Sequence, residues 1–372
     1  ILKKLALLQF ETYDLEMAKY TYSELAKKNS KDLKITRMLA QISFIQEEFL
    51  DAAKYYKNIV DKLGDNFAEN EHIAQIAREN IIALYRIENR PKAQTLSKKF
   101  KAVLSLDDKN EIKLNEGIYY IEIDKKKAEG VFSKLLKDAA LKKNVKIAAF
   151  FWRGVCSVEM KKNDEAEVDF ETVANSIDET FSNQAHLKLG TLNFSNEKYD
   201  KALEHYYKVI ENDEDGKLAF DAARNFAFVC KTIEEWQKAV SAYEIILERW
   251  GDDELESATM FDIAFCHFRD KKYANAIEMF QKAMPILESK ELKAEAQYWI
   301  ADSYFGLDEY EKSISEYLKV GYGYPEFPHW AASAELRAGE AYINLKDNVK
   351  ARRTFERIIE KYGRSSNWGK EA

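Results

Sequence analysis

Proline and glycine are scarce in this chain, and long apolar runs are absent. The 372 residues include four Pro and thirteen Gly, so few residues interrupt helices, and an almost wholly helical chain is expected. The longest apolar run covers residues 147–152, far short of the roughly 20 residues that a membrane-spanning helix needs. Membrane association is therefore expected only through a partner or an anchor outside this sequence.

Residues that usually carry chemistry are few and do not cluster. Cys156, Cys230 and Cys266 cannot all pair with one another, and their apolar surroundings favour buried packing roles. Cys266 and His267 are adjacent, but neighbours on a helix point about 100° apart and form no nucleophile–base pair. No zinc, calcium-loop or glycine-rich phosphate-loop spacing occurs. The sequence predicts no catalytic residue, no metal site, no cofactor and no enzymatic activity.

Charge is unevenly distributed along the chain. The net charge of −7 argues against nucleic acid as a partner. Residues 92–146 reverse the sign, with fourteen Lys against eight Asp and Glu. This basic segment is either a patch for an acidic partner or membrane surface, or a solvated helical face.

Two amphipathic helices and a turn are readable in residues 294–325. Ile300, Ala301 and Tyr304 share one helical face, residues 306–309 form the break, and Tyr317 lies on the apolar face of the second helix. Pro325 cannot continue a helix and ends the unit.

Near-copies of this unit fill the chain. A small residue recurs in each second helix at Ala18, Ala52, Ala93, Ala128, Ala166, Ala202, Ala239, Ala276, Ser313 and Ala351. Four residues after each stand Tyr22, Tyr56, Ser97, Phe132, Phe170, Tyr206, Tyr243, Phe280, Tyr317 and Phe355. Twelve residues before the small residue, eight first helices show Ala6, Ala40, Gly154, Gly190, Ala227, Ala264, Ala301 and Gly339.

This pattern of small and aromatic residues resembles the tetratricopeptide repeat (TPR) family over essentially the whole chain. The resemblance implies an all-α, right-handed solenoid of about ten antiparallel helical hairpins, each supported by its neighbours. The spacing between repeats is 34 to 41 residues, against the family's roughly 34, so helices or turns must be longer.

The third and fourth repeats are poor copies. Ser97 replaces an aromatic residue, and Ile81 and Glu116 stand where a small residue belongs. We therefore distinguish regular repeats in residues 1–64, degenerate repeats in 65–145 and regular repeats in 146–372, and we expect them to form one continuous solenoid. The middle region is either a hinge or insertion, or drift on a loosely constrained surface.

Clues to cellular location conflict. Tyr324-Pro325 and the pair Tyr362 and Ser365 resemble parts of a Tyr-Pro-x-Ser ending found in bacterial cell-envelope TPR proteins. This favours a bacterial periplasm or cell envelope over the cytoplasm, whereas free thiols favour a reducing compartment. The chain begins at Ile1 inside a helical pattern, and we expect it to be a fragment or processed form.

In the TPR family, first helices line a concave groove. The resemblance therefore implies that the residues three before, one after and four after each first-helix small residue face this groove. This assigns to it Phe151, Phe194, Arg224, Phe228, Lys231, Phe261, Phe265, Phe268, Tyr298 and Phe305. These rings either bind a ligand or pack against neighbouring first helices.

The resulting expectation is a non-catalytic interaction scaffold that holds a peptide or helical segment of a partner protein in an aromatic groove. A carrier of an apolar small molecule or lipid in the same groove is one alternative. The other is a self-assembling component, since end hairpins expose apolar faces unless they are capped.

Overall fold

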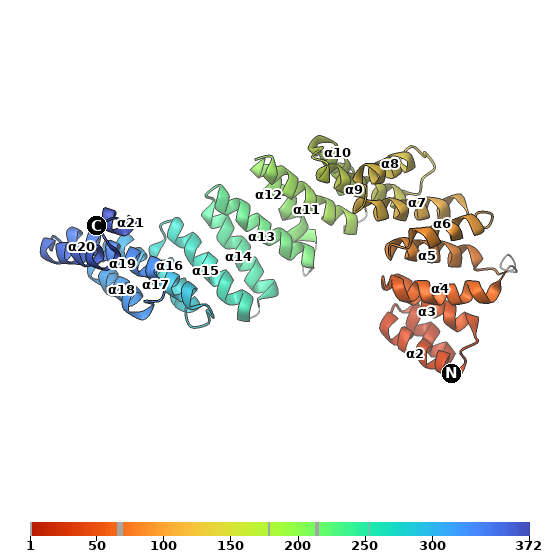
Figure 1. The fold of residues 1–372 in the computed structure, drawn as a ribbon, viewed down its shortest axis with the longest axis horizontal. Helices are drawn as coiled ribbons and strands as arrows, with labels where there is room; N and C mark the ends of the chain where they lie inside the picture. The colour runs from red at the N-terminus through yellow and green to blue at the C-terminus, as the bar shows by residue number, and fades with distance from the viewer. Residues whose placement is uncertain (1, 65–69, 178, 213–215, 252) are drawn as a thin grey trace. The chain divides into compact units, whose positions relative to one another are not determined.

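The computed structural model describes residues 2–64, 70–177, 179–212, 216–251 and 253–372. Ile1 and the first residues of the predicted 65–145 region lie outside these ranges. Within them the chain is all-α, with 21 helices and no strand (Figure 1). The predicted α-solenoid fold is confirmed.

The chain forms two compact units, residues 1–185 and 186–372. The predicted boundaries at residues 64 and 145 concern repeat regularity, and they remain a prediction. Unit 1 contains α1 (Leu2–Glu11), α2 (Leu15–Lys28), α3 (Leu33–Ile45), α4 (Phe49–Leu63), α5 (Ile73–Arg86), α6 (Arg90–Lys99), α7 (Leu106–Ile121), α8 (Lys125–Leu135), α9 (Lys143–Glu159), α10 (Asn163–Ala174) and the start of α11 (Glu179–Ser195).

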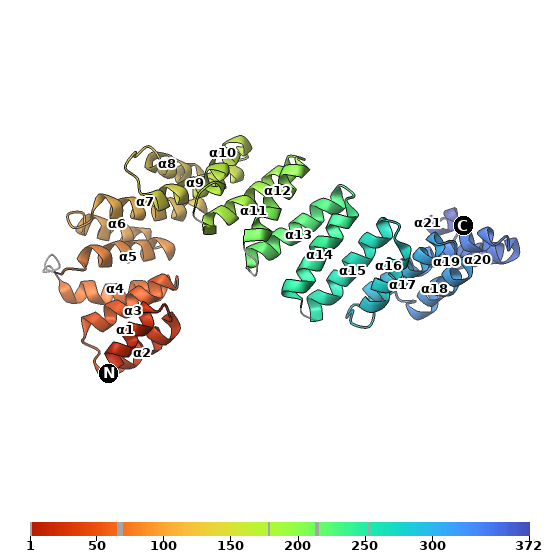
Figure 2. The same cartoon turned by 180° about the vertical axis from the view of Figure 1, so that it is seen from behind.

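Unit 2 continues the series of hairpins. Within each unit, consecutive helices lie side by side from both viewing directions (Figure 2). Unit 2 holds the rest of α11 and α12 (Tyr199–Asn212), α13 (Lys217–Thr232), α14 (Trp236–Trp250), α15 (Asp253–Arg269), α16 (Tyr273–Ala283), α17 (Lys290–Gly306), α18 (Tyr310–Gly323), α19 (Pro328–Asn344), α20 (Asn348–Tyr362) and α21 (Asn367–Glu371).

Each hairpin is held by the small and aromatic residues that the sequence singled out. The recurring small residues of the second helices are all buried, so the helices approach closely. Among the aromatic residues four positions later, Phe132, Phe170 and Phe280 are completely buried. Burial of such a ring contributes about 1.5–3 kcal/mol to folding. The repeated core therefore stabilises each hairpin.

Glycine in a first helix makes room for the aromatic ring of the second. A Cβ built on Gly154 would lie 2.8 Å from the Phe170 ring, and one on Gly190 would lie 2.5 Å from the Tyr206 ring. In the fourth hairpin this residue is Gly117, whose Cβ would lie 2.5 Å from Phe132. The position assigned to Glu116 from the sequence was therefore wrong by one residue.

A shorter turn explains this shift in the fourth hairpin. In the other nine hairpins the turn contains a non-glycine residue at φ between 57° and 62°, such as Lys271 or Asp308. The next N–H donates to the carbonyl five residues earlier, as from Lys272 to His267 at 2.8 Å. Between α7 and α8 no described residue has a positive φ, and the Asp124 N–H bonds only four residues back, to Tyr120.

Stacking changes within the residues 65–145 that the sequence marked as degenerate. Toward the preceding hairpin, the helices α3, α5, α9, α13, α15, α17 and α19 pack mainly on its second helix, whereas α7 packs mainly on its first helix, α5. The third hairpin also has a large residue at the first-helix position that is small in the other hairpins. Ile81 replaces the small residue, and Ile81 and Phe100 are both completely buried in one apolar cluster that also contains Ala93.

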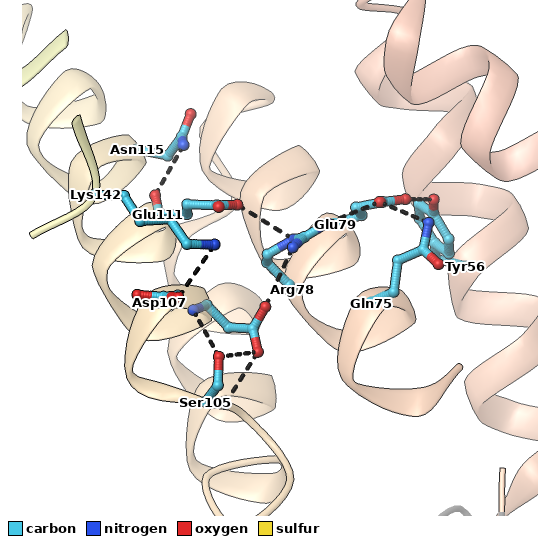
Figure 3. Close-up of polar contacts among 10 residues, drawn as sticks. Tyr56, Gln75, Arg78, Glu79, Ser105, Asp107, Glu111, Asn115 and Lys142 are labelled. Carbon is cyan, nitrogen blue, oxygen red and sulfur yellow. Dashed lines mark hydrogen bonds and ion pairs between the residues drawn. The ribbon is translucent and has the colours of Figure 1, made fainter. Parts of the chain in front are cut away.

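An ionic network fastens α7 to α5. From α5, Arg78 reaches Asp108 at 3.2 Å and Glu111 at 3.3 Å on α7, as well as the neighbouring Glu79 at 3.2 Å (Figure 3). Glu79 is buried and also accepts a hydrogen bond from the Tyr56 hydroxyl of α4. One guanidinium therefore links three carboxylates from two helices at the place where the regular stacking changes.

Candidate functional site

The first helices α11, α13 and α15 line a depression of about 470 Å³ in unit 2, which we call the unit 2 pocket. Its size falls within the range of small ligand sites. It lies where the sequence predicted inward-facing residues on successive first helices. Its lining comprises Leu187, Lys188, Thr191, Asp221, Arg224, Asn225, Phe228, Tyr243 and Asp262.

Phe228 is the most exposed aromatic side chain of the pocket. It stands on α13, is 57% exposed, and touches Phe194 of α11 edge to face, with ring centroids 5.5 Å apart. One turn earlier on α13, Arg224 is exposed and makes no ion pair with the described residues. An apolar ring and an available guanidinium therefore lie side by side on one helix face.

The opposite wall of the pocket is held by a salt bridge. Lys231 of α13 lies 2.8 Å from Asp262 of α15. Burial, together with the nearby Asp262 carboxylate, raises the pKa of the Tyr243 phenol above its usual range. These groups neutralise or satisfy one another, so Lys231 serves to fix the two helices, whereas the Arg224 guanidinium lies over the Phe220 ring at 5.7 Å.

The predicted phenylalanine stripe on α15 lies among rings of neighbouring helices. Phe261 packs against Phe280 with centroids 5.2 Å apart. Phe265 and Phe268 pack on Trp299 of α17 at 5.4 and 4.8 Å. All three Phe side chains remain partly exposed. Packing is thus an observed role of the stripe, and ligand binding by it remains a prediction.

The last two predicted groove residues of unit 2 extend this ring contact. Tyr298 packs on Trp330 of α19 with centroids 5.3 Å apart. Phe305 lies under the Arg337 guanidinium at 4.2 Å. Both side chains are half-buried, so they stabilise the contact between adjacent hairpins and offer only an edge to solvent.

Phe151 belongs to the core of unit 1. Its side chain is 3% exposed and is enclosed by Trp152, Phe170 and Phe181, with centroids 5.2 to 5.8 Å away. The ring therefore has no open surface for a partner. The prediction that placed Phe151 in the groove is therefore wrong. In this hairpin the position three residues before Gly154 lies between packed helices and not on an open face.

A larger groove lies in unit 1, and the sequence reasoning missed it. This unit 1 groove encloses about 710 Å³ and is lined by residues of α3, α4, α5, α7, α9 and α11. Its aromatic residues are Phe44, Phe49, Trp152 and Phe181. Phe44 stands four residues after Ala40, so the same offset rule finds it once it is applied to the early hairpins.

The remaining predicted features have structural roles. Cys156, Cys230 and Cys266 are free thiols in the core, and burial raises their pKa values to about 11 or 12, which makes them unreactive. Burial also lowers the pKa of His267, a half-buried imidazole. Among the residues that the structure describes, no cluster of three or more His, Cys, Asp or Glu is arranged for a metal ion, and no helix is suited to cross a membrane.

The two end hairpins differ in how they are covered. The described α1–α2 hairpin exposes several large apolar side chains, including Leu5, Leu8 and Tyr20. At the other end, the short helix α21 packs on α19 and α20, and Trp368 lies against Tyr362 and His329. Self-association through the α1–α2 surface remains a prediction.

Comparison with known proteins gives the family signal chiefly in the second half of the chain. Models described as tetratricopeptide repeat match residues 184–215, 218–289, 294–320 and 333–365. No protein with a curated description matches the chain.

Several solved structures are similar to this chain at low identity. The C-terminal part of a TPR repeat-containing protein from Cytophaga hutchinsonii is 16% identical, with 69% of this chain and 98% of that chain covered and a TM-score of 0.49. A tetratricopeptide repeat protein from Parabacteroides merdae is 15% identical, with coverage of 74% and 96% and a TM-score of 0.38. YrrB, described as a TPR protein with an unusual peptide-binding site, is 18% identical, with coverage of 47% and 84% and a TM-score of 0.36.

Proposed function

The chain carries tetratricopeptide repeats, and we propose that it is a non-catalytic scaffold whose unit 2 pocket binds a peptide segment of a partner protein. Proteins built from these repeats generally bind protein or peptide partners. The observation that carries the proposal is Phe228, a 57% exposed ring beside an Arg224 without an ion pair among the described residues. An exposed aromatic residue next to an available cation is typical of an anchor point for a partner.

The polar residues of the pocket suit a main chain. Asn225 lies one residue after Arg224 on α13, whereas the Thr191 hydroxyl of α11 already donates to the Leu187 carbonyl and accepts from Tyr206. An amide side chain offers both a donor and an acceptor, which complements a peptide group. Arg224 complements a carboxylate of an acidic side chain through two parallel hydrogen bonds. An extended segment with one apolar residue beside one acidic residue therefore fits the lining.

The proposal requires no chemical step. The Lys231–Asp262 salt bridge and the buried Tyr243 phenol are committed to fixing α13, α14 and α15. What remains in the lining is an aromatic ring, the Arg224 guanidinium, the charged Lys188 and Asp221, and neutral polar groups. These groups provide recognition, and each anchoring side chain contributes about 2 kcal/mol when a partner covers it.

The test is a selection of binding peptides from a random twelve-residue library with the full chain. Affinities of the selected peptides are then measured by fluorescence anisotropy for Phe228→Ser and Arg224→Ser. Tyr207→Ser is the matched control, because Tyr207 is 50% exposed on the second helix α12 and does not line the pocket. We expect each pocket variant to weaken binding about thirtyfold and the control to leave it unchanged.

Two outcomes would contradict this function. Peptides that bind both pocket variants as well as the native chain would place the site elsewhere. If no peptide is selected and mass spectrometry of extracts from the native chain shows an apolar small molecule that Phe228→Ser lacks, the pocket is a carrier site instead.

A further inference from the structure

A second pocket opens between the second helices α4 and α6 of unit 1, with α5 contributing to its lining. We call it the Asn80 pocket; its volume is about 400 Å³. Leu50, Val60, Leu84 and Leu96 form apolar walls. Leu50 is 56% exposed, so an apolar side chain stands open to solvent at the rim. The unit 2 pocket and the unit 1 groove are lined mainly by first helices, so this is a different surface.

Asn80 is a polar residue at a position that is apolar in seven of the other nine hairpins, the charged Glu116 and Arg153 occupying it in the remaining two. It directly precedes Ile81, and the residues that precede the small residue in other hairpins include Leu39, Leu189 and Ile300, all buried. Asn80 is itself only 2% exposed. Since it lines the pocket, its polar side chain meets only the narrow space of that pocket.

The Asn80 amide also lacks a protein partner. It makes no hydrogen bond with any residue of the described ranges, although it lines the pocket. Its amide atoms are not among the fully enclosed polar atoms that lack a partner, so they keep a small accessible surface in the pocket, where water or a ligand can hydrogen-bond them. The amide offers two donors and one acceptor toward the pocket. A ligand group that both donates and accepts a hydrogen bond satisfies it.

The rim of the pocket is positively charged. Lys57 of α4 and Lys92 of α6 both line it, and neither forms an ion pair within the described part of the chain. Lys54 pairs with Asp51 on its own helix at 2.9 Å. Asp61 is the one carboxylate of the lining. Acidic groups of a ligand are therefore favoured next to the pocket. Lys92 is also the first residue of the basic segment 92–146, which adds further positive charge.

We propose that the Asn80 pocket binds an acidic peptide through a single tyrosine side chain. The ring lies against Leu50, Val60, Leu84 and Leu96, and the hydroxyl donates to the Asn80 carbonyl oxygen or accepts from its amide nitrogen. Flanking Asp or Glu residues of the peptide pair with Lys57 and Lys92. A tyrosine matches the pocket better than a fatty acid does, because a carboxylate accepts hydrogen bonds only, whereas a hydroxyl matches both parts of an amide.

The test uses three five-residue peptides with blocked, fluorescently labelled ends and the full chain. The first has a central Tyr flanked by Glu and Asp, the second replaces Tyr by Phe, and the third keeps Tyr but has Lys flanks. We expect the acidic Tyr peptide to bind at least tenfold more tightly than the Phe peptide, since a site that hydrogen-bonds a hydroxyl discriminates against its loss. The Lys-flanked peptide should not bind measurably.

Variants assign the effect to named residues. An apolar residue occupies this position in seven of the other nine hairpins, so Asn80→Leu should fold, and it should abolish the preference for Tyr over Phe. The double variant Lys57→Glu, Lys92→Glu should lose at least tenfold in affinity for the acidic peptide. The matched control is Lys126→Glu, Lys134→Glu, which makes the same charge change at exposed lysines of α8 and should leave binding unchanged.

Each contrary result overturns the proposal. Equal binding of the Tyr and Phe peptides removes the role of Asn80. If no peptide binds at millimolar concentration and Asn80→Leu raises the unfolding free energy, Asn80 is a buried amide satisfied by solvent and the proposal is wrong. If no peptide binds but lauric acid does, and the lysine double variant binds lauric acid less tightly, the pocket is an acyl-chain site instead.

Discussion

Two glycines of the α7–α8 hairpin are predicted to respond in opposite ways to the same substitution. On Gly117 of α7, a Cβ would lie 2.5 Å from Cε1 and 2.7 Å from Cζ of Phe132. Favourable contacts between carbon atoms need about 3.5–4 Å, so the ring or a helix must move by about 1 Å. On Gly130 of α8, a Cβ would meet nothing within 4 Å.

The magnitudes decide the signs. Overpacking a buried site costs about 1–3 kcal/mol, and Phe132 is completely buried, so its ring has little room to yield. Alanine is favoured over glycine within a helix by about 1 kcal/mol. Gly117→Ala should therefore lose about 1 kcal/mol of local stability, whereas Gly130→Ala should gain about 0.5–1 kcal/mol.

The assay must report on this hairpin, because repeat arrays need not unfold as one unit. Hydrogen exchange measured by mass spectrometry on fragments covering α7 and α8 meets this need. We expect about fivefold faster exchange for Gly117→Ala and slower exchange for Gly130→Ala. Adding Phe132→Leu to Gly117→Ala should recover part of the loss, since the two residues are in contact. If both alanine variants slow exchange, the close approach of Gly117 and Phe132 is refuted.

Three further predictions concern stability. Lys271 has a φ of 57°, a left-handed conformation that glycine adopts without strain. Lys271→Gly should therefore raise the unfolding free energy measured by urea titration by about 1 kcal/mol. Equal stabilisation by Lys271→Ala would contradict this. Burial, together with the His205 ring whose Nδ1 lies 3.0 Å away, lowers the pKa of His186 to about 4, below its usual value of about 6.5. As the pH falls, the unfolded chain takes up this proton before the folded chain does. The contribution of His186 to the unfolding free energy is therefore complete above pH 6.5 and falls by up to about 3 kcal/mol as the pH drops to 4. His186→Asn should flatten this dependence of stability on pH, and an unchanged dependence would contradict the prediction. Arg78→Met should lower the unfolding free energy by about 2–3 kcal/mol, because it leaves three carboxylates without their cation. Arg352→Met, at an exposed pair, should leave stability unchanged, and equal losses for the two variants would contradict the role of the network.

The repeat pattern predicted the hairpin core because small and aromatic residues must alternate wherever two helices approach closely. It failed at Glu116 because counting a fixed twelve residues back from Ala128 assumes a constant turn length. The α7–α8 turn lacks the residue with positive φ, so the small position is Gly117. Turn length depends on backbone conformation, which residue spacing alone does not report.

The candidate site was predictable in part. Arg224 and Phe228 line the unit 2 pocket, as the offset rule implied, but the rule cannot tell an exposed ring from a packed one. Phe265 and Phe268 therefore resemble Phe228 in sequence while packing on Trp299. The Asn80 pocket lay beyond the rule altogether, because the rule considers only first-helix residues that face the predicted groove.

Site-specific photocrosslinking tests the central claim, that the unit 2 pocket holds a peptide segment. Benzoylphenylalanine replaces Phe228 in one preparation and Tyr207 in another, and each is irradiated with a peptide from the library selection. Mass spectrometry then maps the adducts. The account predicts a crosslink from position 228, suppressed by excess unlabelled peptide, and none from position 207. Equal crosslinking at both positions, or none at position 228, would contradict it.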